Sequence, residues 1–175
     1  MRVLVQRSKN SKVTIDGKVN GEIDHGFVLL VGFTNGDNET IIDKMINKII
    51  NLRILEDENE KMNLSILDTK GSILSISQFT LYANCKEGRR PSFVEALSPN
   101  DATKLYDLFN EKLGKLVHVE TGIFGSDMKV EIYKPMTMDE AQQLRYSLQN
   151  YADRNRNWCR IQKLSINQYL GSSDV

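Results

Sequence analysis

Residues 75–93 read SISQFTLYANCKEGRRPSF, an alternating half followed by a basic half. The alternation of β-branched, aromatic and polar residues predicts a strand over residues 72–83. With a period of two, Gln78 and Thr80 share a face with Leu74 and Ile76, whose apolar side chains predict that this face is core. Since an unpaired polar group in a core costs roughly 2 kcal/mol or more, the amide and the hydroxyl need partners.

The basic half places Gly88 and the pair Arg89-Arg90 just beyond this strand. An apolar strand therefore places small polar side chains next to a loop that carries two arginines. This arrangement suits an anionic ligand.

The rest of the chain predicts more strands and two helices. Strands are expected at residues 2–8, 12–15, 18–23, 27–33, 53–56, 63–67, 117–120 and 128–133. Asp16-Gly17 is a strong signal for a two-residue hairpin, and residues 27–33 form an unbroken apolar run typical of a central strand. Asn38 predicts the cap of one helix, and Ser98-Pro99 that of another. Many strands with two helices predict an α+β domain.

Composition narrows the possible functions. The 175 residues suffice for one domain, with 40% hydrophobic and 26% charged residues, which is ordinary for a soluble protein. Lys plus Arg equals Asp plus Glu, so any RNA contact must come from a local patch. No apolar run approaches the roughly 20 residues of a membrane span, and Met1–Val5 begins as a strand without a signal peptide, so a cytoplasmic protein is expected.

No metal site and no cofactor are expected. Cys85 and Cys159 lack the spacing of metal ligands or of a disulfide pair, and His25 and His118 are isolated from other ligand residues. The acidic turn 57–60 also lacks a ligand spacing and is interpreted as solvated.

Five blocks in sequence order resemble the D-aminoacyl-tRNA deacylase family over residues 1–132. They are MRVLVQR from residue 1, NLRILEDENEKMNLS from 51, SQFTLYA from 77, GRRPSF from 88 and ETGIFGSDM from 120. The resemblance implies a homodimer with the site at the interface of its two subunits, and a compact, β-rich, barrel-like antiparallel sheet with two packed helices. It also implies hydrolysis of the ester between a D-amino acid and the terminal adenosine of tRNA, with glycyl-tRNA mischarged on tRNA(Ala) as a further candidate substrate. The implied partner is the aminoacylated 3′ end of tRNA, with no DNA and no membrane.

By this resemblance Ser77, Gln78, Phe79 and Thr80 line the catalytic site. Main-chain N–H groups around Gln78 and Phe79 are candidate donors to the oxyanion. Thr80 is either a nucleophile or part of the pocket wall; no His or Lys neighbours it in sequence, which favours attack by water assisted by the ribose 2′-OH. An ordinary strand threonine is the alternative.

The resemblance also implies substrate-binding residues outside that tetrad. Phe79 is expected to stack on the terminal adenine, unless it is a core residue. The expected binding residues are Arg7, Lys86, Arg89, Arg90, Phe124, Met128 and Pro135. Taken alone, a methionine at position 128 is more often a core residue, and an exposed turn with two arginines is usually just solvated.

The chain departs from the family after residue 133. The family ends in a Gly-Pro-Val-Thr motif that excludes L-amino acids. Here Lys134-Pro135-Met136-Thr137 can be aligned with it only by deleting about two residues and with lysine in place of glycine. A Cβ and a long side chain would crowd that position. Thr137 and Glu140 instead predict a capping box and a helix over 138–152, so residues 1–133 are interpreted as the deacylase-like domain and 134–175 as an atypical extension.

Two origins for this extension stay open: a fusion or frameshift, and a diverged family member. The leading functional hypothesis is an esterase on aminoacyl-tRNA. The alternatives are a catalytically impaired module that binds the acceptor end without chiral selectivity, and a destabilised product with an exposed sheet edge.

Overall fold

The computed structural model describes residues 1–86 and 88–133. Residues Met1–Ala83 and Ser92–Lys134 form one compact unit, and the segment Asn84–Pro91 lies outside it. The predicted helix over 138–152 and the Lys134–Thr137 motif lie outside the described residues.

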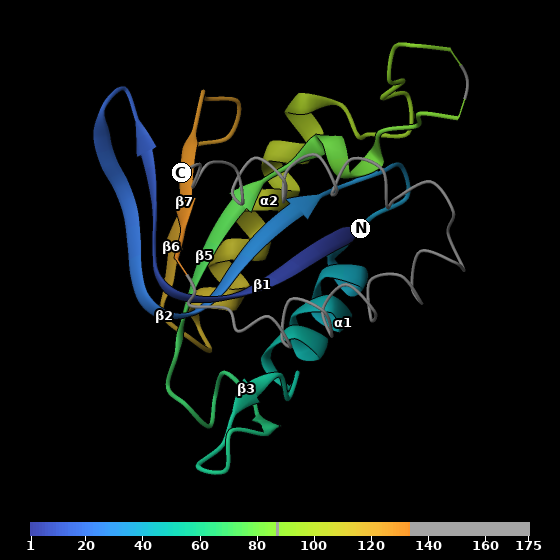
Figure 1. The fold of residues 1–175 in the computed structure, drawn as a ribbon. Helices are drawn as coiled ribbons and strands as arrows, with labels where there is room; N and C mark the ends of the chain where they lie inside the picture. The colour runs from blue at the N-terminus through green and yellow to red at the C-terminus, as the bar shows by residue number, and fades with distance from the viewer. Residues whose placement is uncertain (87, 134–175) are drawn as a thin grey trace. The chain divides into compact units, whose positions relative to one another are not determined.

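A long hairpin forms the centre of the sheet (Figure 1). Strand β1 (Arg2–Ile15) pairs antiparallel with β2 (Lys18–Gly32) along nearly its whole length. The two-residue turn predicted at Asp16-Gly17 is confirmed, and both residues have positive φ, 49° and 76°, as a tight hairpin turn requires. The separately predicted strands 2–8 and 12–15 are one continuous strand.

The remaining strands complete a five-stranded sheet in the order β6-β5-β2-β1-β7, with β5 (Ser72–Ser77), β6 (Val119–Thr121) and β7 (Lys129–Ile132). A separate small sheet pairs β3 (Leu55–Glu56) with β4 (Met62–Leu64).

The expected antiparallel pairing is corrected in part, since β5 runs parallel to both β2 and β6. The physical reason is that helix α1 (Glu39–Ile50) lies between β2 and β5 in the chain, and helix α2 (Pro99–Gly114) between β5 and β6. Such a crossover returns the chain to the same end of the sheet, where a hairpin would reverse it. In the described residues β6 and β7 end the sheet without pairing to each other, so the barrel-like sheet is open. The α+β class with two packed helices is confirmed.

Both helices begin where the sequence predicts. The side chain of Asn38 accepts from the Ile41 N–H, and that of Ser98 from the Asp101 N–H. Each cap satisfies an N–H group that the first turn of a helix leaves without an intrahelical partner.

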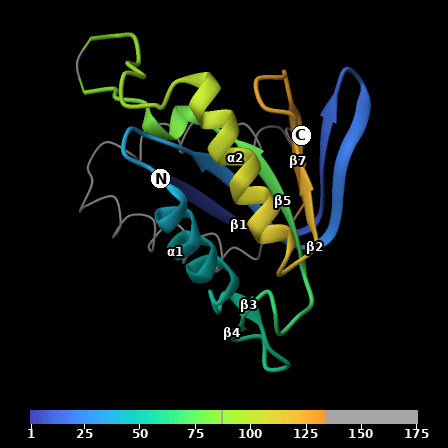
Figure 2. The same cartoon turned by 180° about the vertical axis from the view of Figure 1, so that it is seen from behind.

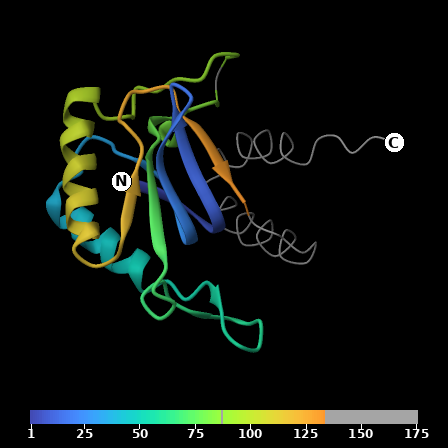
Figure 3. The same cartoon turned by 90° about the vertical axis from the view of Figure 1, so that its left-hand side faces the viewer.

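The buried side chains on the two faces of the sheet belong to two different clusters. Both helices cover the same face (Figures 2 and 3), where Phe27, Leu29 and Val31 of β2 join the buried isoleucines of α1 and the aromatic side chains of α2. The opposite face gathers Val13, Ile23, Val28, Leu74 and Ile76. Strand β5 is therefore buried on both sides and is a rigid support for the residues that follow it.

Among the described residues, no helix has the length and apolar character needed to cross a membrane.

Candidate active site at the end of strand β5

Strand β5 stops at Ser77, which pairs with Val31 of β2. The next main-chain N–H, that of Gln78, donates to the Val31 carbonyl at 2.7 Å. A Cβ on Gly32 would come within 2.8 Å of the Gln78 carbonyl oxygen, so a glycine is needed for this close approach. Gln78 is thereby held at the very end of β2.

The chain then turns into a short 3-10 helix, η1 (Phe79–Tyr82). The Leu81 N–H donates to the Gln78 carbonyl at 3.3 Å, and the Ala83 N–H to the Thr80 carbonyl at 3.0 Å. The strand predicted over 72–83 is wrong beyond Ser77, because β2 ends at Gly32 and offers no further backbone partner. Gln78 and Thr80 therefore do not continue the line of Leu74 and Ile76.

This turn leaves two main-chain donors available. In residues 1–86 and 88–133, no acceptor is found for the N–H groups of Phe79 and Thr80. Free N–H groups at the start of a helical turn are suited to a developing negative charge. The N–H of Gln78, by contrast, is occupied by Val31.

Leu81 and Tyr82 of the turn are buried, Gln78 and Thr80 are partly exposed, and Phe79 is exposed. The Gln78 Nε2 donates to Thr80 Oγ1, so the two polar side chains satisfy each other. Phe79 is 55% exposed, and its ring meets Phe93 edge-on with 5.1 Å between centroids. The alternative of a core phenylalanine at position 79 does not hold.

Arg7 lies on β1, opposite Phe27 of β2. Its guanidinium Nη1 donates to the Ile54 carbonyl at 3.1 Å and to the Glu56 carboxylate at 3.0 Å. Arg7 therefore connects the central hairpin to the segment that leads into the small sheet.

One hydrogen bond from the loop after β6 and one from helix α2 meet at the same carbonyl of β5. The Gly122 N–H donates to the Ser75 carbonyl at 3.0 Å, and the Tyr106 hydroxyl donates to the same carbonyl at 2.8 Å. Phe124 packs against the Tyr106 ring, with centroids 6.0 Å apart. The loop that carries Phe124 is thus anchored to the strand that ends at Ser77.

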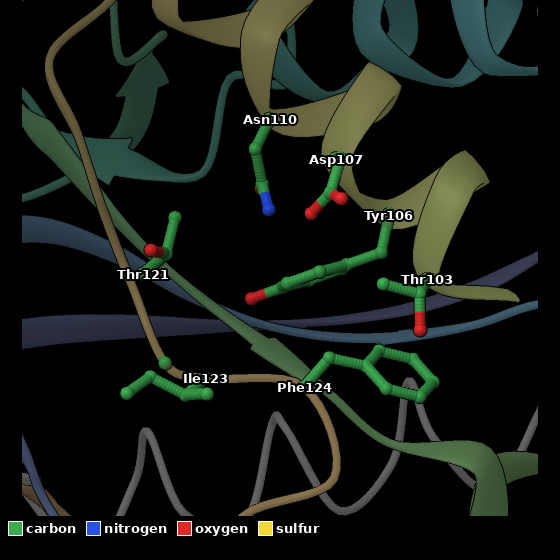
Figure 4. A pocket seen from close by; sticks show the side chains of 8 residues that line it. Thr103, Tyr106, Asp107, Asn110, Thr121, Ile123 and Phe124 are labelled. Atoms are coloured by element: carbon green, nitrogen blue, oxygen red, sulfur yellow. The ribbon is translucent and has the colours of Figure 1, made fainter. Parts of the chain in front are cut away.

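Between α2 and this loop lies a cavity of about 450 Å³ (Figure 4). Its walls are Thr103, Tyr106, Asp107, Asn110, Thr121, Gly122, Ile123 and Phe124. Burial raises the pKa of Tyr106 above its ordinary value, so the phenol stays neutral. The buried Asn110 Oδ1 has no hydrogen-bond partner in the described part of the chain.

Met128 packs with the cluster on the opposite face of the sheet from the helices. A Cβ on Gly122 would overlap its sulfur atom, so Met128 lies beside the same loop that carries Phe124. The loop therefore brings the two residues toward β5 from different sides.

A sequence profile described as "D-Tyr-tRNA(Tyr) deacylase" matches residues 4–138. The chain belongs to the D-aminoacyl-tRNA deacylase family. The match ends six residues beyond residue 132, the predicted end of the resemblance.

Relatives named D-aminoacyl-tRNA deacylase include one from Bacillus cytotoxicus, 54% identical over 79% of this chain and 97% of its own length. Another from a Geobacillus species is 53% identical over 79% of this chain and 93% of its own.

Two solved structures are similar to the fold. One, titled "c-Myc DNA Unwinding Element Binding Protein", superposes with a TM-score of 0.72 at 34% identity, covering 75% of this chain and 91% of that one. The other is titled a probable eukaryotic D-amino acid tRNA deacylase; its TM-score is 0.67 at 13% identity, covering 76% and 93%, and it bears on the fold alone.

The remaining residues implied by the deacylase family lie outside the compact unit or outside the described chain. Lys86, Arg89 and Arg90 belong to the segment Asn84–Pro91 and are exposed. The Lys86 N–H donates to Asn84 Oδ1 at 3.0 Å, which shapes the first turn of this segment. Pro135 lies outside the described residues. No three His, Cys, Asp or Glu side chains gather as metal ligands in the described ranges.

Sequence reasoning missed the hydroxyl of Tyr106 and the amide of Asn110. Helical spacing predicts Tyr106 on the inner face of α2, and it is 2% exposed. Nothing in that periodicity distinguishes a phenol that bonds to β5 from an apolar core residue. The signal that was available is the polar residue Asn110 one turn further along the same helix.

Proposed function

We propose that this chain hydrolyses the ester that joins a D-amino acid to the terminal adenosine of tRNA. The observation that carries the proposal is the pair of N–H groups of Phe79 and Thr80, which have no acceptor among the described residues and lie where β5 ends. Water adds to the ester carbonyl carbon, the oxyanion accepts from these donors, and the ribose oxygen leaves as the free 3′-hydroxyl. One such donor is typically worth about 100- to 1,000-fold in kcat.

The attacking group in this proposal is water, and its proton is taken with the help of the ribose 2′-OH. The tetrad Ser77–Thr80 contains no ionisable side chain, and the Thr80 hydroxyl accepts from Gln78 Nε2. Thr80 therefore forms part of the pocket wall and orients the Gln78 amide. A 2′-OH dependence also restricts the reaction to RNA.

Phe79 supplies the surface for the terminal adenine. Its ring is 55% exposed and is oriented by the edge of Phe93. An accessible aromatic ring of fixed orientation stacks on an unpaired base with about 1–3 kcal/mol. Phe124 and Met128 are proposed to support the same adenosine, and Lys86, Arg89 and Arg90 to bind the phosphates of the acceptor end. Arg7, whose guanidinium donates to Ile54 and Glu56, is proposed to brace the part of the site that selects chirality.

A second function is favoured by one observation. Lys134-Pro135-Met136-Thr137 fits the chirality-selecting motif of the family only if about two residues are deleted and lysine takes the place of glycine. Loss of that motif would suit a protein that binds the acceptor end without selecting for D-amino acids. The deacylase name shared by relatives above 50% identity supports the enzymatic function over this alternative.

Hydrolysis of D-Tyr-tRNA and L-Tyr-tRNA side by side tests the proposal. Release of D-Tyr alone is the expected result. Release of both amino acids would mean that the protein is an esterase without chiral selectivity. Binding of tRNA without hydrolysis of either substrate would overturn the proposed function.

The family resemblance adds two expectations, a homodimer and action in the cytoplasm where tRNA is used. Light scattering after gel filtration should give twice the mass of one chain. Activity that persists in a strictly monomeric protein would contradict the expectation that two subunits form the site.

A further inference from the structure

A residue at the start of the chain contacts the turn that carries the proposed oxyanion donors. Arg2 pairs with Gly32 in the β1–β2 hairpin, which places it at the end of the sheet where η1 begins. Its guanidinium Nη1 donates to the Leu81 carbonyl at 2.7 Å. The same guanidinium lies over the Tyr82 ring, 4.3 Å from its centroid.

Helix η1 needs such support because it is only four residues long. Short 3-10 turns have poor hydrogen-bond geometry and do not persist alone. The Leu81 carbonyl lies near the C-terminal end of the turn, where a cation complements the exposed carbonyl groups. Arg2 supplies that cation, a donor and a planar stacking surface at once.

Gly32, the partner of Arg2, contacts the other side of the same turn. A Cβ there would lie 2.8 Å from the Gln78 carbonyl oxygen and 3.3 Å from the Leu81 Cβ. The turn is thus fixed at its start by the bond from Gln78 to Val31 and near its end by Arg2. Between these two points lie the N–H groups of Phe79 and Thr80.

Tyr82 takes part through its ring and stays uncharged. Burial and the nearby Asp37 carboxylate raise its pKa to about 12, against the opposing effect of Arg2. The hydroxyl is therefore protonated at neutral pH, and the partner of Arg2 is the face of a neutral phenol.

We propose that Arg2 is a positioning residue for ester hydrolysis: through the Leu81 carbonyl and the Tyr82 ring it holds the Phe79 and Thr80 N–H groups in the geometry that the oxyanion requires. The proposal rests on the proposed function. Arg2 touches no reacting atom, so it should act on turnover and leave substrate binding almost unchanged.

The test compares Arg2→Met and Arg2→Lys with the parent protein, using D-Tyr-tRNA at two salt concentrations. Arg2→Met keeps an unbranched apolar side chain and removes the donor and the charge; Arg2→Lys restores a charge and one donor without the planar fork. The matched control is Lys18→Met, which removes an exposed cation from the turn end of the same hairpin.

We expect kcat to fall about tenfold or more in Arg2→Met with KM within twofold, because misplacing a catalytic group by about 1 Å can cost up to 100-fold. Arg2→Lys should recover part of this deficit, and Lys18→Met should match the parent.

A second readout does not depend on activity. Amide hydrogen exchange should be about tenfold faster at Leu81 and Ala83 in Arg2→Met, as expected when a local opening becomes easier by about 1.4 kcal/mol, and unchanged in helix α1. Unchanged exchange at Leu81 and Ala83 would overturn the inference.

A rise in KM with unchanged kcat and a weaker salt dependence would also overturn it, since that pattern marks a phosphate contact. If the parent protein hydrolyses neither D-Tyr-tRNA nor L-Tyr-tRNA, the proposed function fails, and the exchange measurement alone decides whether Arg2 holds the turn.

Discussion

The role of the Thr80 hydroxyl distinguishes two mechanisms, attack by Thr80 itself and attack by water. In the structure the hydroxyl accepts from Gln78 Nε2, and neither histidine of the chain lies in the tetrad 77–80. A threonine without a neighbouring base is a poor nucleophile.

Thr80→Val is expected to lower kcat by no more than about tenfold, the scale of one displaced polar contact. Removal of a true nucleophile lowers kcat by roughly a millionfold, so a collapse of that size would assign covalent catalysis to Thr80. Steady-state hydrolysis of D-Tyr-tRNA measures the difference, with Thr14→Val on β1 as the control for the same chemical change.

Phe79→Ala should separate function from stability. Because the ring is 55% exposed, its removal is expected to cost less than about 1.5 kcal/mol of unfolding free energy, the value of one aromatic pair. If the ring stacks on adenine, the decrease in kcat should be large although the decrease in stability is small.

The matched control is Phe109→Ala, which removes a ring that is 0% exposed and should cost about 3–5 kcal/mol. Chemical denaturation and kinetics on both variants provide the comparison. Equal decreases of stability in the two would contradict the exposed position of Phe79.

At the scale of elements, Arg89 and Arg90 of the segment Asn84–Pro91 are exposed and are proposed to bind RNA phosphates. Replacing both Arg89 and Arg90 by alanine should weaken tRNA affinity and reduce the slope of log K against log salt by about 0.7–0.9 for each phosphate that is no longer neutralised. The control is the double replacement of Lys44 and Lys48 by alanine, since both are exposed on α1. Titrations at three salt concentrations measure the slope, and an unchanged slope for the arginine pair would show that this segment is merely solvated.

The elements also show what sequence can and cannot predict. The Asp16-Gly17 turn and the caps at Asn38 and Ser98 were predictable because each depends on local backbone geometry. The end of β5 was not, because it depends on where a distant strand stops, at Gly32 of β2. Residues 78–82 do alternate in sequence, but no neighbouring strand is available to pair with them, so they do not extend β5.

The candidate site was predictable only in part for the same reason. Motif resemblance identifies Phe79 and Phe124, but the residues that fix their surroundings come from other elements: Arg2 and Gly32 from the hairpin, Tyr106 from α2. No local pattern links residues so distant in sequence. The parallel pairing of β5 had a signal in the sequence, since a predicted helix separates the strand at residues 27–33 from β5, but which strands are neighbours in the sheet is not given by their order along the chain.

At the scale of the whole molecule, several carboxylates favour folding at neutral pH. The Ser65 hydroxyl and N–H donate to Asp68 at 2.7 and 2.8 Å and hold its pKa below the ordinary value. Hydrogen bonds from Lys61, Asn59 and Asn63 do the same for the pKa of Asp57. A carboxylate with a depressed pKa stabilises the fold above its unfolded pKa, and this contribution disappears as pH falls through the folded value.

The free energy of unfolding should therefore decline below about pH 4. Asp68→Asn should be less stable than the parent at pH 7 and should be destabilised less on going to pH 3. Urea denaturation at both pH values measures this difference. An equal decrease in the two proteins would mean that Asp68 does not contribute to the acid sensitivity.

The position of β2 between β1 and β5 has a consequence for biosynthesis. A hairpin forms within about 10 microseconds, so β1 and β2 are able to pair as soon as they leave the ribosome. Strand β5 follows only after residues 33–71 have been made, a delay of a few seconds at about 5–20 residues per second. During that interval the nascent chain presents an unpaired, largely apolar strand edge, which is a site for aggregation or chaperone capture. The arrival of β5 closes that edge and also positions the turn that carries the proposed oxyanion donors, so the edge is protected and the proposed site forms in the same step.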